Sequence, residues 1–224
     1  MSYLYLCPFC LVLAAIFIVV ERAERYVEAD VIKGLASLTF VLLGFLGAGG
    51  FHATPYAAKI VVGLLVGAIA DVLLNLRYVF EGKKGQAAFL VGILVFLIGH
   101  LIYLWAILPT CRYWGIAVAA GLVCTGALMM WIFQRIEATL PFKIFGIFYI
   151  GAIAILNCMA VLALIQHPSA HTIVFLVGVV LFLMSDVILI LNTFGPKKSF
   201  VMRVSNLMLY YVGQLLIALS LQLL

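Results

Sequence analysis

The stretch Ala70-Asp71-Val72-Leu73-Leu74-Asn75-Leu76 places one carboxylate inside a long apolar run. A second stretch, Ser185-Asp186-Val187-Ile188-Leu189-Ile190-Leu191, does the same 115 residues later. A carboxylate inside a membrane helix is energetically expensive, so each aspartate is a candidate functional residue by default. The structural alternative is an aspartate that pairs with a lysine or joins neighbouring helices by buried hydrogen bonds. Because the pair recurs in matching surroundings, we favour the functional interpretation.

The pattern repeats beyond the aspartates. Each aspartate run ends in a basic turn, at residues 82–84 in the first copy and 195–198 in the second. Each turn leads into another apolar run, which carries His100 or Gln214, and these two residues are 114 positions apart. One short gap in the turn therefore aligns both helices of each copy, which indicates an internal repeat.

Composition assigns the chain to the membrane proteins, because 67% of its 224 residues are hydrophobic and only 9% are charged. No soluble domain of this size has that balance. Basic residues occur singly or in pairs at the ends of apolar runs, which does not favour a nucleic-acid partner. The fold class that we predict is an all-α polytopic bundle of eight transmembrane helices. The apolar runs lie at 3–20, 31–51, 56–80, 86–108, 113–133, 141–165, 171–194 and 199–222.

The distribution of Lys and Arg predicts the orientation in the membrane. Eleven of the thirteen lie at the connections after the odd-numbered runs, whereas Lys59 and Arg112 are the exceptions. Cytoplasmic loops are the ones enriched in Lys and Arg. We therefore expect both termini outside the cytoplasm, and, for a bacterial source, a place in the inner membrane. His52, His167 and His171 are then expected at solvated outer helix ends.

Four helices per copy is an even number, so the two copies must share one orientation. The sequence thus predicts a single transmembrane domain, 1–224, built from two parallel repeats of about 1–110 and 111–224. A pseudo-two-fold axis along the membrane normal would relate them.

Helical rise places the two aspartates at similar depths. Asp71 is roughly 14 Å and Asp186 roughly 12 Å from the predicted cytoplasmic helix ends, with His100 and Gln214 deeper, at roughly 20 Å. Lys33 lies only about 5 Å inside its predicted helix. We expect Lys33 and Lys143, which opens the corresponding run of the second copy, to attract an anionic group at the rim. The residues expected to bind or orient a substrate are Lys33, Asn75, His100, Tyr103, Lys143, Ser185, Asn192, Tyr210 and Gln214.

Two carboxylates in one low-dielectric cavity form an acid–base pair. Burial favours the neutral form of a carboxyl group, and a second carboxylate nearby favours it further, so the pair holds one proton. Such a pair suits acid-catalysed cleavage through an oxocarbenium ion. Neither aspartate has the Cys, His and Asp surroundings that a metal requires, so we expect no metal and no cofactor. The residues leave open which aspartate is the acid.

The order and spacing of these residues resemble the YhhN-type lysoplasmalogenase family of eight-helix membrane proteins. The resemblance covers nearly the whole chain and is carried by Lys33, residues 71–74, Phe89…Gly92…Phe96…His100…Tyr103, Gly178…Phe182…residues 185–189…Asn192…Phe194, and Tyr210-Tyr211…Gln214. It implies hydrolysis of the sn-1 vinyl ether bond of lysoplasmalogens, which gives a fatty aldehyde and glycerophosphoethanolamine or glycerophosphocholine. It also implies a lysophospholipid partner, within the bilayer.

A proton-coupled transporter or lipid scramblase is the alternative, because parallel repeats also build transporters. Intramembrane charge is concentrated toward the predicted cytoplasmic half of the chain. A transporter needs exits on both sides, so this asymmetry favours a one-sided enzyme pocket.

Overall fold

The computed structural model of the chain describes residues 3–224, so residues 1 and 2 of the predicted domain and first repeat lie outside it. The described residues form eight α-helices joined by short turns and 3₁₀ segments. The helices are α1 (Leu6–Arg22), α2 (Tyr26–Gly47), α3 (Pro55–Asn75), α4 (Gly82–Ile107), α5 (Trp114–Phe133), α6 (Leu140–Gln166), α7 (Ala170–Phe194) and α8 (Phe200–Ser220). The predicted all-α class is therefore confirmed.

Seven helices in the described part of the chain, α2 to α8, are long and apolar enough to cross a membrane. The chain is accordingly a multi-pass membrane protein. The helix α1 has 17 residues, roughly 26 Å of helical rise, which is short of the usual span of about 20 residues. Its role as the eighth span stays a prediction.

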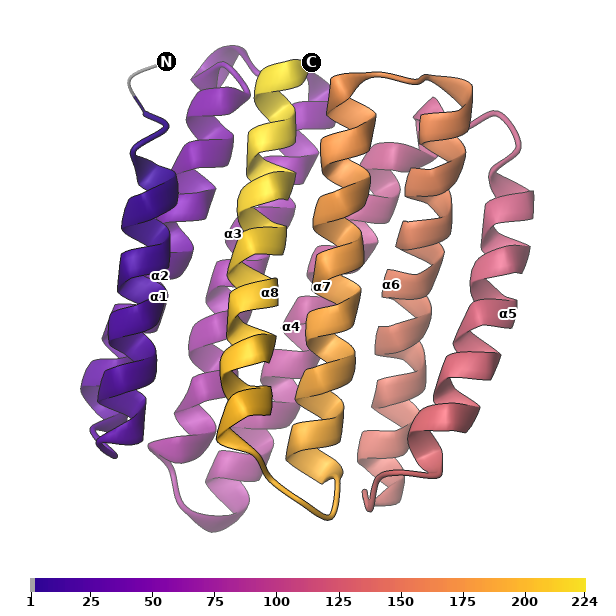
Figure 1. The fold of residues 1–224 in the computed structure, drawn as a ribbon. Coiled ribbons are helices and arrows are strands. Elements are labelled where there is room, and N and C mark those ends of the chain that lie inside the picture. Colours follow the sequence, from indigo (N-terminus) through magenta and orange to yellow (C-terminus); the bar gives the residue numbers. More distant parts are fainter. Residues whose placement is uncertain (1–2) are drawn as a thin grey trace.

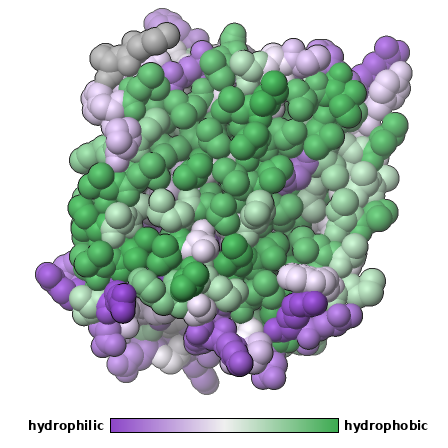
Figure 2. Space-filling model, in the orientation of Figure 1, coloured by the Kyte–Doolittle hydropathy of each residue, from purple (hydrophilic) through white to green (hydrophobic). Residues whose placement is uncertain are grey.

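The helices run alternately up and down, and both chain ends lie at the same end of the bundle (Figure 1). We name this the terminal end. The opposite end, which we name the basic end, carries the α1–α2, α3–α4, α5–α6 and α7–α8 connections, where most Lys and Arg residues lie. Hydrophobic side chains cover the middle of the visible face, whereas hydrophilic ones gather at the two ends (Figure 2).

Helix contacts give each half of the chain the same order of neighbours. Within the first half α1 packs on α2, α2 on α3 and α3 on α4, and α5 to α8 pack in the same sequence. Between the halves, α4 packs against α6, and α8 packs against α2. Helices α2, α4, α6 and α8 thereby join the two halves, with α5 at one edge in contact with α6 (Figure 1).

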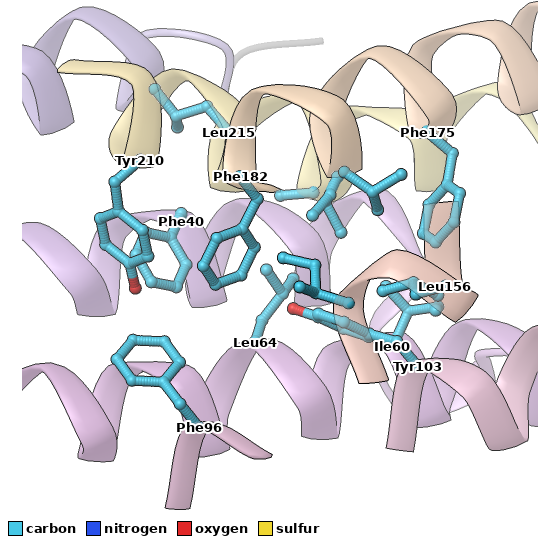
Figure 3. Close-up of a cluster of buried hydrophobic side chains, with 14 of the residues drawn as sticks. Phe40, Ile60, Leu64, Phe96, Tyr103, Leu156, Phe175, Phe182, Tyr210 and Leu215 are labelled. Carbon is cyan, nitrogen blue, oxygen red and sulfur yellow. The ribbon is translucent and has the colours of Figure 1, made fainter. Parts of the chain in front are cut away.

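Glycines permit the closest helix approaches in the core. A Cβ added at Gly178 of α7 would lie 2.9 Å from the Gly213 carbonyl oxygen of α8, and one added at Gly99 of α4 would lie 3.5 Å from the Gly63 oxygen of α3. Small residues of this kind let membrane helices approach backbone to backbone. Around these contacts lies a cluster of buried aromatic and aliphatic side chains (Figure 3).

Most helix boundaries agree with the predicted runs within a few residues, but two differ by five. The helix α3 ends at Asn75 instead of 80, which places Asp71 about 6 Å from that helix end instead of roughly 14 Å. The helix α2 begins at Tyr26, five residues before the predicted start at 31. Its first turns contain Glu28 and Asp30, so an apolar window omits them. The error matters because it changes the depth of Lys33. That residue lies seven positions after Tyr26, about 10 Å into the helix instead of about 5 Å.

Candidate active site

Asp71 lies in the last turns of α3 and is held by three donors. Lys33 Nζ of α2 is 3.2 Å from Asp71 Oδ1, and both side chains are at most 5% exposed. Ser37 Oγ, one turn further along α2, donates to Asp71 Oδ2 at 2.6 Å, and the Tyr210 hydroxyl of α8 donates to the same oxygen at 2.5 Å. Charge-assisted bonds of this kind stabilise a carboxylate in its ionised form.

The structure places the two predicted rim lysines differently. Lys33 is buried and paired with Asp71, so its charge is already balanced within the helix bundle. Lys143 is half-buried, with its Nζ 5.8 Å from the centre of the Phe133 ring, and it does not line the cavity that holds the aspartates. Their predicted role in attracting an anion has no support from this geometry.

Asp186 lies in α7 and has a different environment. The Tyr149 hydroxyl of α6 donates to Asp186 Oδ2 at 2.8 Å. Within residues 3–224, no Lys, Arg or His side chain forms an ion pair with this carboxyl group, which is 3% exposed. The two aspartates therefore differ: Asp71 has a cation beside it, and Asp186 has a phenol.

Both aspartates line one small cavity, which we call the acidic cavity. Its volume is about 30 Å³, enough for about two water molecules. Asn75, one turn after Asp71, also lines it, and among residues 3–224 neither polar atom of the Asn75 amide has a hydrogen-bond partner. Buried polar atoms without protein partners are places where water binds. The cavity thus brings together two carboxylates and room for water.

Several other predicted residues form a hydrogen-bonded series that ends at Asp71. The Tyr103 hydroxyl donates to Gln214 Oε1 at 3.4 Å, and Gln214 Nε2 donates to the Tyr210 hydroxyl at 3.3 Å. Tyr210 in turn donates to Asp71. In Figure 3 the side chains of Tyr103 and Tyr210 extend into the same buried layer. This series fixes the orientation of Tyr210 and, through it, of the Asp71 carboxylate.

His100 lies behind the acidic cavity instead of lining it. Its Nδ1 is 2.9 Å from the Phe96 carbonyl oxygen, and its ring is edge-on to Tyr149, with centroids 5.1 Å apart. Because Nδ1 donates to that carbonyl, the free Nε2 is an acceptor, and it has no partner. His100 therefore positions Tyr149 through packing.

Ser185 and Asn192 have local roles. Asn206 Nδ2 of α8 donates to the Ser185 hydroxyl at 2.8 Å and to the Ser185 carbonyl at 2.9 Å, which ties α8 to α7 beside Asp186. The Asn192 side chain accepts from the Ser199 backbone N–H at 2.7 Å, across the α7–α8 turn. Ser185 thus lines the acidic cavity, whereas Asn192 lies at the basic end.

Two further spaces adjoin the acidic cavity. A narrow apolar pocket lies among α4, α5, α6 and α7, with Tyr149, Met129, Phe133 and Phe142 in its wall. A larger vestibule of about 420 Å³ opens at the basic end. Phe89 and Leu189 line all three spaces, so the acidic cavity, the apolar pocket and the vestibule meet at these two side chains.

Comparison with known proteins now assigns the chain to a family. The YhhN family model matches residues 29–221. The chain belongs to the YhhN family. Neither the curated proteins nor the solved structures gave a significant match. The YhhN family includes lysoplasmalogenases, and the matched residues begin just before Lys33 and extend past Gln214, so both aspartates and the hydrogen-bonded series lie within the YhhN match.

Sequence reasoning missed four side chains around the two aspartates: Ser37, Tyr149, Asn206 and the buried Asp30, whose Oδ1 has no hydrogen-bond partner. Tyr149 is the informative case. It follows Lys33 by 116 positions, close to the 115 that separates the aspartates, and it contacts Asp186 as Lys33 contacts Asp71. The strict offset of 115 from Lys33 falls on Phe148, one position before Tyr149, so extending the repeat would have pointed to this turn of α6 and not to Lys143.

His171, at the terminal end, also differs from its prediction. It is buried, with Nδ1 2.8 Å from the Ser220 carbonyl oxygen and Nε2 3.1 Å from the Tyr56 hydroxyl. The expectation that it is solvated was wrong, because α3, α7 and the end of α8 converge there. His52 and His167 are exposed, as expected.

Proposed function

We propose that this YhhN-family chain is a lysoplasmalogenase-like hydrolase that cleaves the sn-1 vinyl ether bond of lysoplasmalogens. The observation that carries the proposal is the shared cavity of Asp71, paired with a lysine, and Asp186, which has no cation beside it. That difference supplies an acid and an anion at one place. Family membership supports the substrate, and the carboxylates support the reaction type.

Asp186 is the acid in this mechanism. A buried carboxylate without a counter-charge is far less stable than the neutral acid. With Tyr149 donating to Oδ2, we place the proton of Asp186 on Oδ1. A neutral carboxylic acid beside an apolar pocket can transfer that proton to carbon.

Asp71 is the anion in this mechanism. An ionised carboxylate offers about four lone-pair sites, and Lys33, Ser37 and Tyr210 occupy three of them. The remaining site can bind a water molecule in the acidic cavity and orient it. The negative charge also stabilises a cation that forms nearby, which is the electrostatic effect that accelerates oxocarbenium chemistry.

The reaction follows from these two roles. Asp186 gives its proton to the outer carbon of the vinyl ether double bond, which is the carbon not bonded to oxygen. The positive charge then spreads over the inner carbon, which is bonded to oxygen, and over the ether oxygen itself. Water adds to the inner carbon, and its proton returns to the Asp186 carboxylate. In the resulting hemiacetal the hydroxyl proton moves to the ether oxygen, the carbon–oxygen bond breaks, and an aldehyde and an alcohol leave. One water molecule is consumed, and both aspartates return to their starting states.

The apolar pocket, with a volume of about 40 Å³, suits the first carbons of the alkenyl chain. Its lining is almost entirely hydrophobic, and Tyr149 presents its ring to the pocket and its hydroxyl to Asp186. A chain in this pocket would bring its first double bond to the junction at Phe89 and Leu189. The substrate thus spans the boundary between apolar and acidic surfaces.

The proposal includes two parallel repeats with eight spans and both termini outside the cytoplasm. Two pairs of residue contacts support the repeat, because they recur at an offset of 114–116 residues: Lys33–Asp71 with Tyr149–Asp186, and Gly63–Gly99 with Gly178–Gly213. The packing of α4 on α6 likewise recurs as the packing of α8 on α2. The excess of basic residues at the basic end supports the orientation.

A proton-coupled transporter or scramblase is the second candidate, and one observation favours it. A cavity of about 620 Å³ lies at the terminal end, lined by His167, His171 and Phe175. Phe182, however, lies between Phe175 and Asp186 along α7 and packs edge-on against Phe96 and Tyr210 (Figure 3). This aromatic layer separates the two cavities, which favours the hydrolase.

The deciding experiment is incubation of the purified protein with a lysoplasmalogen and measurement of released fatty aldehyde. We expect Asp71→Asn and Asp186→Asn each to lower kcat by about 10²–10⁴-fold, the usual contribution of acid–base groups. The double variant should lose little more, because the two residues act as a unit. Glu28→Gln, at an exposed glutamate of α2, is the control. A folded parental protein that releases no aldehyde refutes the proposal, and near-parental release by either aspartate variant refutes the mechanism.

A further inference from the structure

Arg77 is a cation with no carboxylate at ion-pair distance among residues 3–224. Its Nε is buried without a hydrogen-bond partner in this part of the chain, and its Nη2 donates to the Tyr78 hydroxyl at 2.7 Å. The guanidinium lies over the Phe89 ring, 4.3 Å from the centroid. An anion gains the most binding free energy from a guanidinium that is partly buried and has no ion-pair partner.

The position of Arg77 connects two of the spaces described above, because it lines both the acidic cavity and the vestibule. It follows Asp71 by six residues, about 9 Å of helical rise. A glycerol unit with its phosphoester bonds spans a comparable distance. An anion on Arg77 would therefore be connected to Asp71 and Asp186 by a short polar linker.

The vestibule itself is cationic. Lys198 and Arg203 line it together with Arg77, and no Asp or Glu is present among its described lining residues. Glu21 neutralises Arg203 through two bonds of 2.6 and 2.9 Å, whereas Lys198 is exposed and, in the described chain, unpaired. The net positive charge of the vestibule therefore comes from Arg77 and Lys198.

We propose that Arg77, assisted by Lys198, binds the phosphate group of a single-chain phospholipid whose chain lies in the apolar pocket. The proposal rests on the proposed function and assigns the headgroup end of that same site. A guanidinium presents paired N–H donors that match phosphate oxygens. Lys33 cannot serve here, because Asp71 already pairs with it. A lipid is favoured over a free phosphoester because the vestibule and the apolar pocket adjoin, with Phe89 and Leu189 in the walls of both.

The test measures binding of three probes to the purified full-length protein in detergent. Palmitoyl-lysophosphatidylethanolamine has the phosphate and a chain, monopalmitoylglycerol has the chain alone, and glycerophosphoethanolamine has the phosphate alone. We expect Arg77→Gln to weaken binding of the lysophospholipid about 10- to 100-fold, the range for a lost charged hydrogen bond, and to leave monopalmitoylglycerol binding unchanged. Arg77→Lys, which keeps the charge, should fall between Arg77→Gln and the parental protein.

Arg135→Gln is the matched control. Arg135 lies at the basic end and stacks on Trp131, 4.1 Å from the ring centroid, but it lines none of the three spaces. We expect Arg135→Gln to bind every probe as the parental protein does. Thermal unfolding of each variant checks that the binding data come from folded protein.

Several outcomes would overturn the proposal. If Arg77→Gln binds the lysophospholipid as tightly as the parental protein does, Arg77 has no role in binding. If Arg77→Gln loses equal affinity for the lysophospholipid and for monopalmitoylglycerol, the substitution does not act on phosphate binding. Glycerophosphoethanolamine binding as tightly as the lysophospholipid would identify a free phosphoester site. Palmitoyl-lysophosphatidylethanolamine contains an ester and no vinyl ether, so its binding is measured independently of hydrolysis. If its binding depends on Arg77 but the protein releases no aldehyde from a lysoplasmalogen, only the proposed function is refuted. Aldehyde release with Arg77-independent binding refutes only the phosphate site.

Discussion

Replacement of Lys33 by methionine tests the buried ion pair with Asp71. The two side chains are 5% and 3% exposed, so removal of the lysine leaves a carboxylate inside the bundle with no counter-charge. Breaking a buried pair from one side is typically worth 3–5 kcal/mol, so we expect Lys33→Met to lower the free energy of unfolding by about that much. For a chain of this size 1 kcal/mol corresponds to about 2–4 °C, which gives a fall in Tm of roughly 6–20 °C.

Asp71→Asn should destabilise to a similar extent, because it leaves the Lys33 ammonium unpaired. The double variant, Lys33→Met with Asp71→Asn, removes both charges and should recover most of the loss. Thermal unfolding in detergent measures all three proteins. Lys143→Met is the control, because Lys143 forms no ion pair within the described residues, and its Tm should stay near the parental value. If the two single losses simply add in the double variant, the two charges are not coupled and the argument fails.

Three further predictions address other parts of the molecule. Tyr149→Phe removes the hydrogen bond from the Tyr149 hydroxyl to Asp186 and keeps the ring, so kcat for aldehyde release should fall about 10-fold with little change in Tm; an unchanged kcat would mean that the bond does not matter. Gly178→Ala places a methyl group 2.9 Å from the Gly213 oxygen and should cost about 1–3 kcal/mol of stability, whereas Gly126→Ala, with open space around it, should be tolerated. A C-terminal reporter that is active only in the cytoplasm should stay silent, and a strong signal would reverse the predicted orientation.

The number, order and length of the helices were readable from the sequence because apolar runs and turn residues alternate regularly along it. Two boundaries were not, because Glu28 and Asp30 interrupt the apolar pattern at the start of α2, and because apolar residues continue to Phe80 although α3 ends at Asn75. The first of these errors moved Lys33 toward the surface in the prediction. A lysine at the solvated end of a helix can attract an anion, whereas a lysine buried beside Asp71 already has one. A small error in the helix boundary therefore changed the role assigned to Lys33.

The aspartates were found because a charge stands out in an apolar run, but their partners were found unevenly. Tyr210 and Gln214 were selected from their spacing on one helix face, and they do form a series that ends at Asp71. Tyr149 was missed because a tyrosine does not stand out in a helix that contains several other aromatic residues. The unpaired state of Arg77 depends on where neighbouring side chains point, which spacing along the chain does not reveal.

Because the three spaces meet at Phe89 and Leu189, cleavage at that junction would leave the two products facing different solvents. The aldehyde would remain on the hydrocarbon side and partition into the bilayer, whereas the glycerophosphate-bearing alcohol would face water through the vestibule. Neither product would have to pass the other on its way out. A build-up of one would then block only its own exit, so inhibition by the soluble product and inhibition by the fatty product would be kinetically distinct.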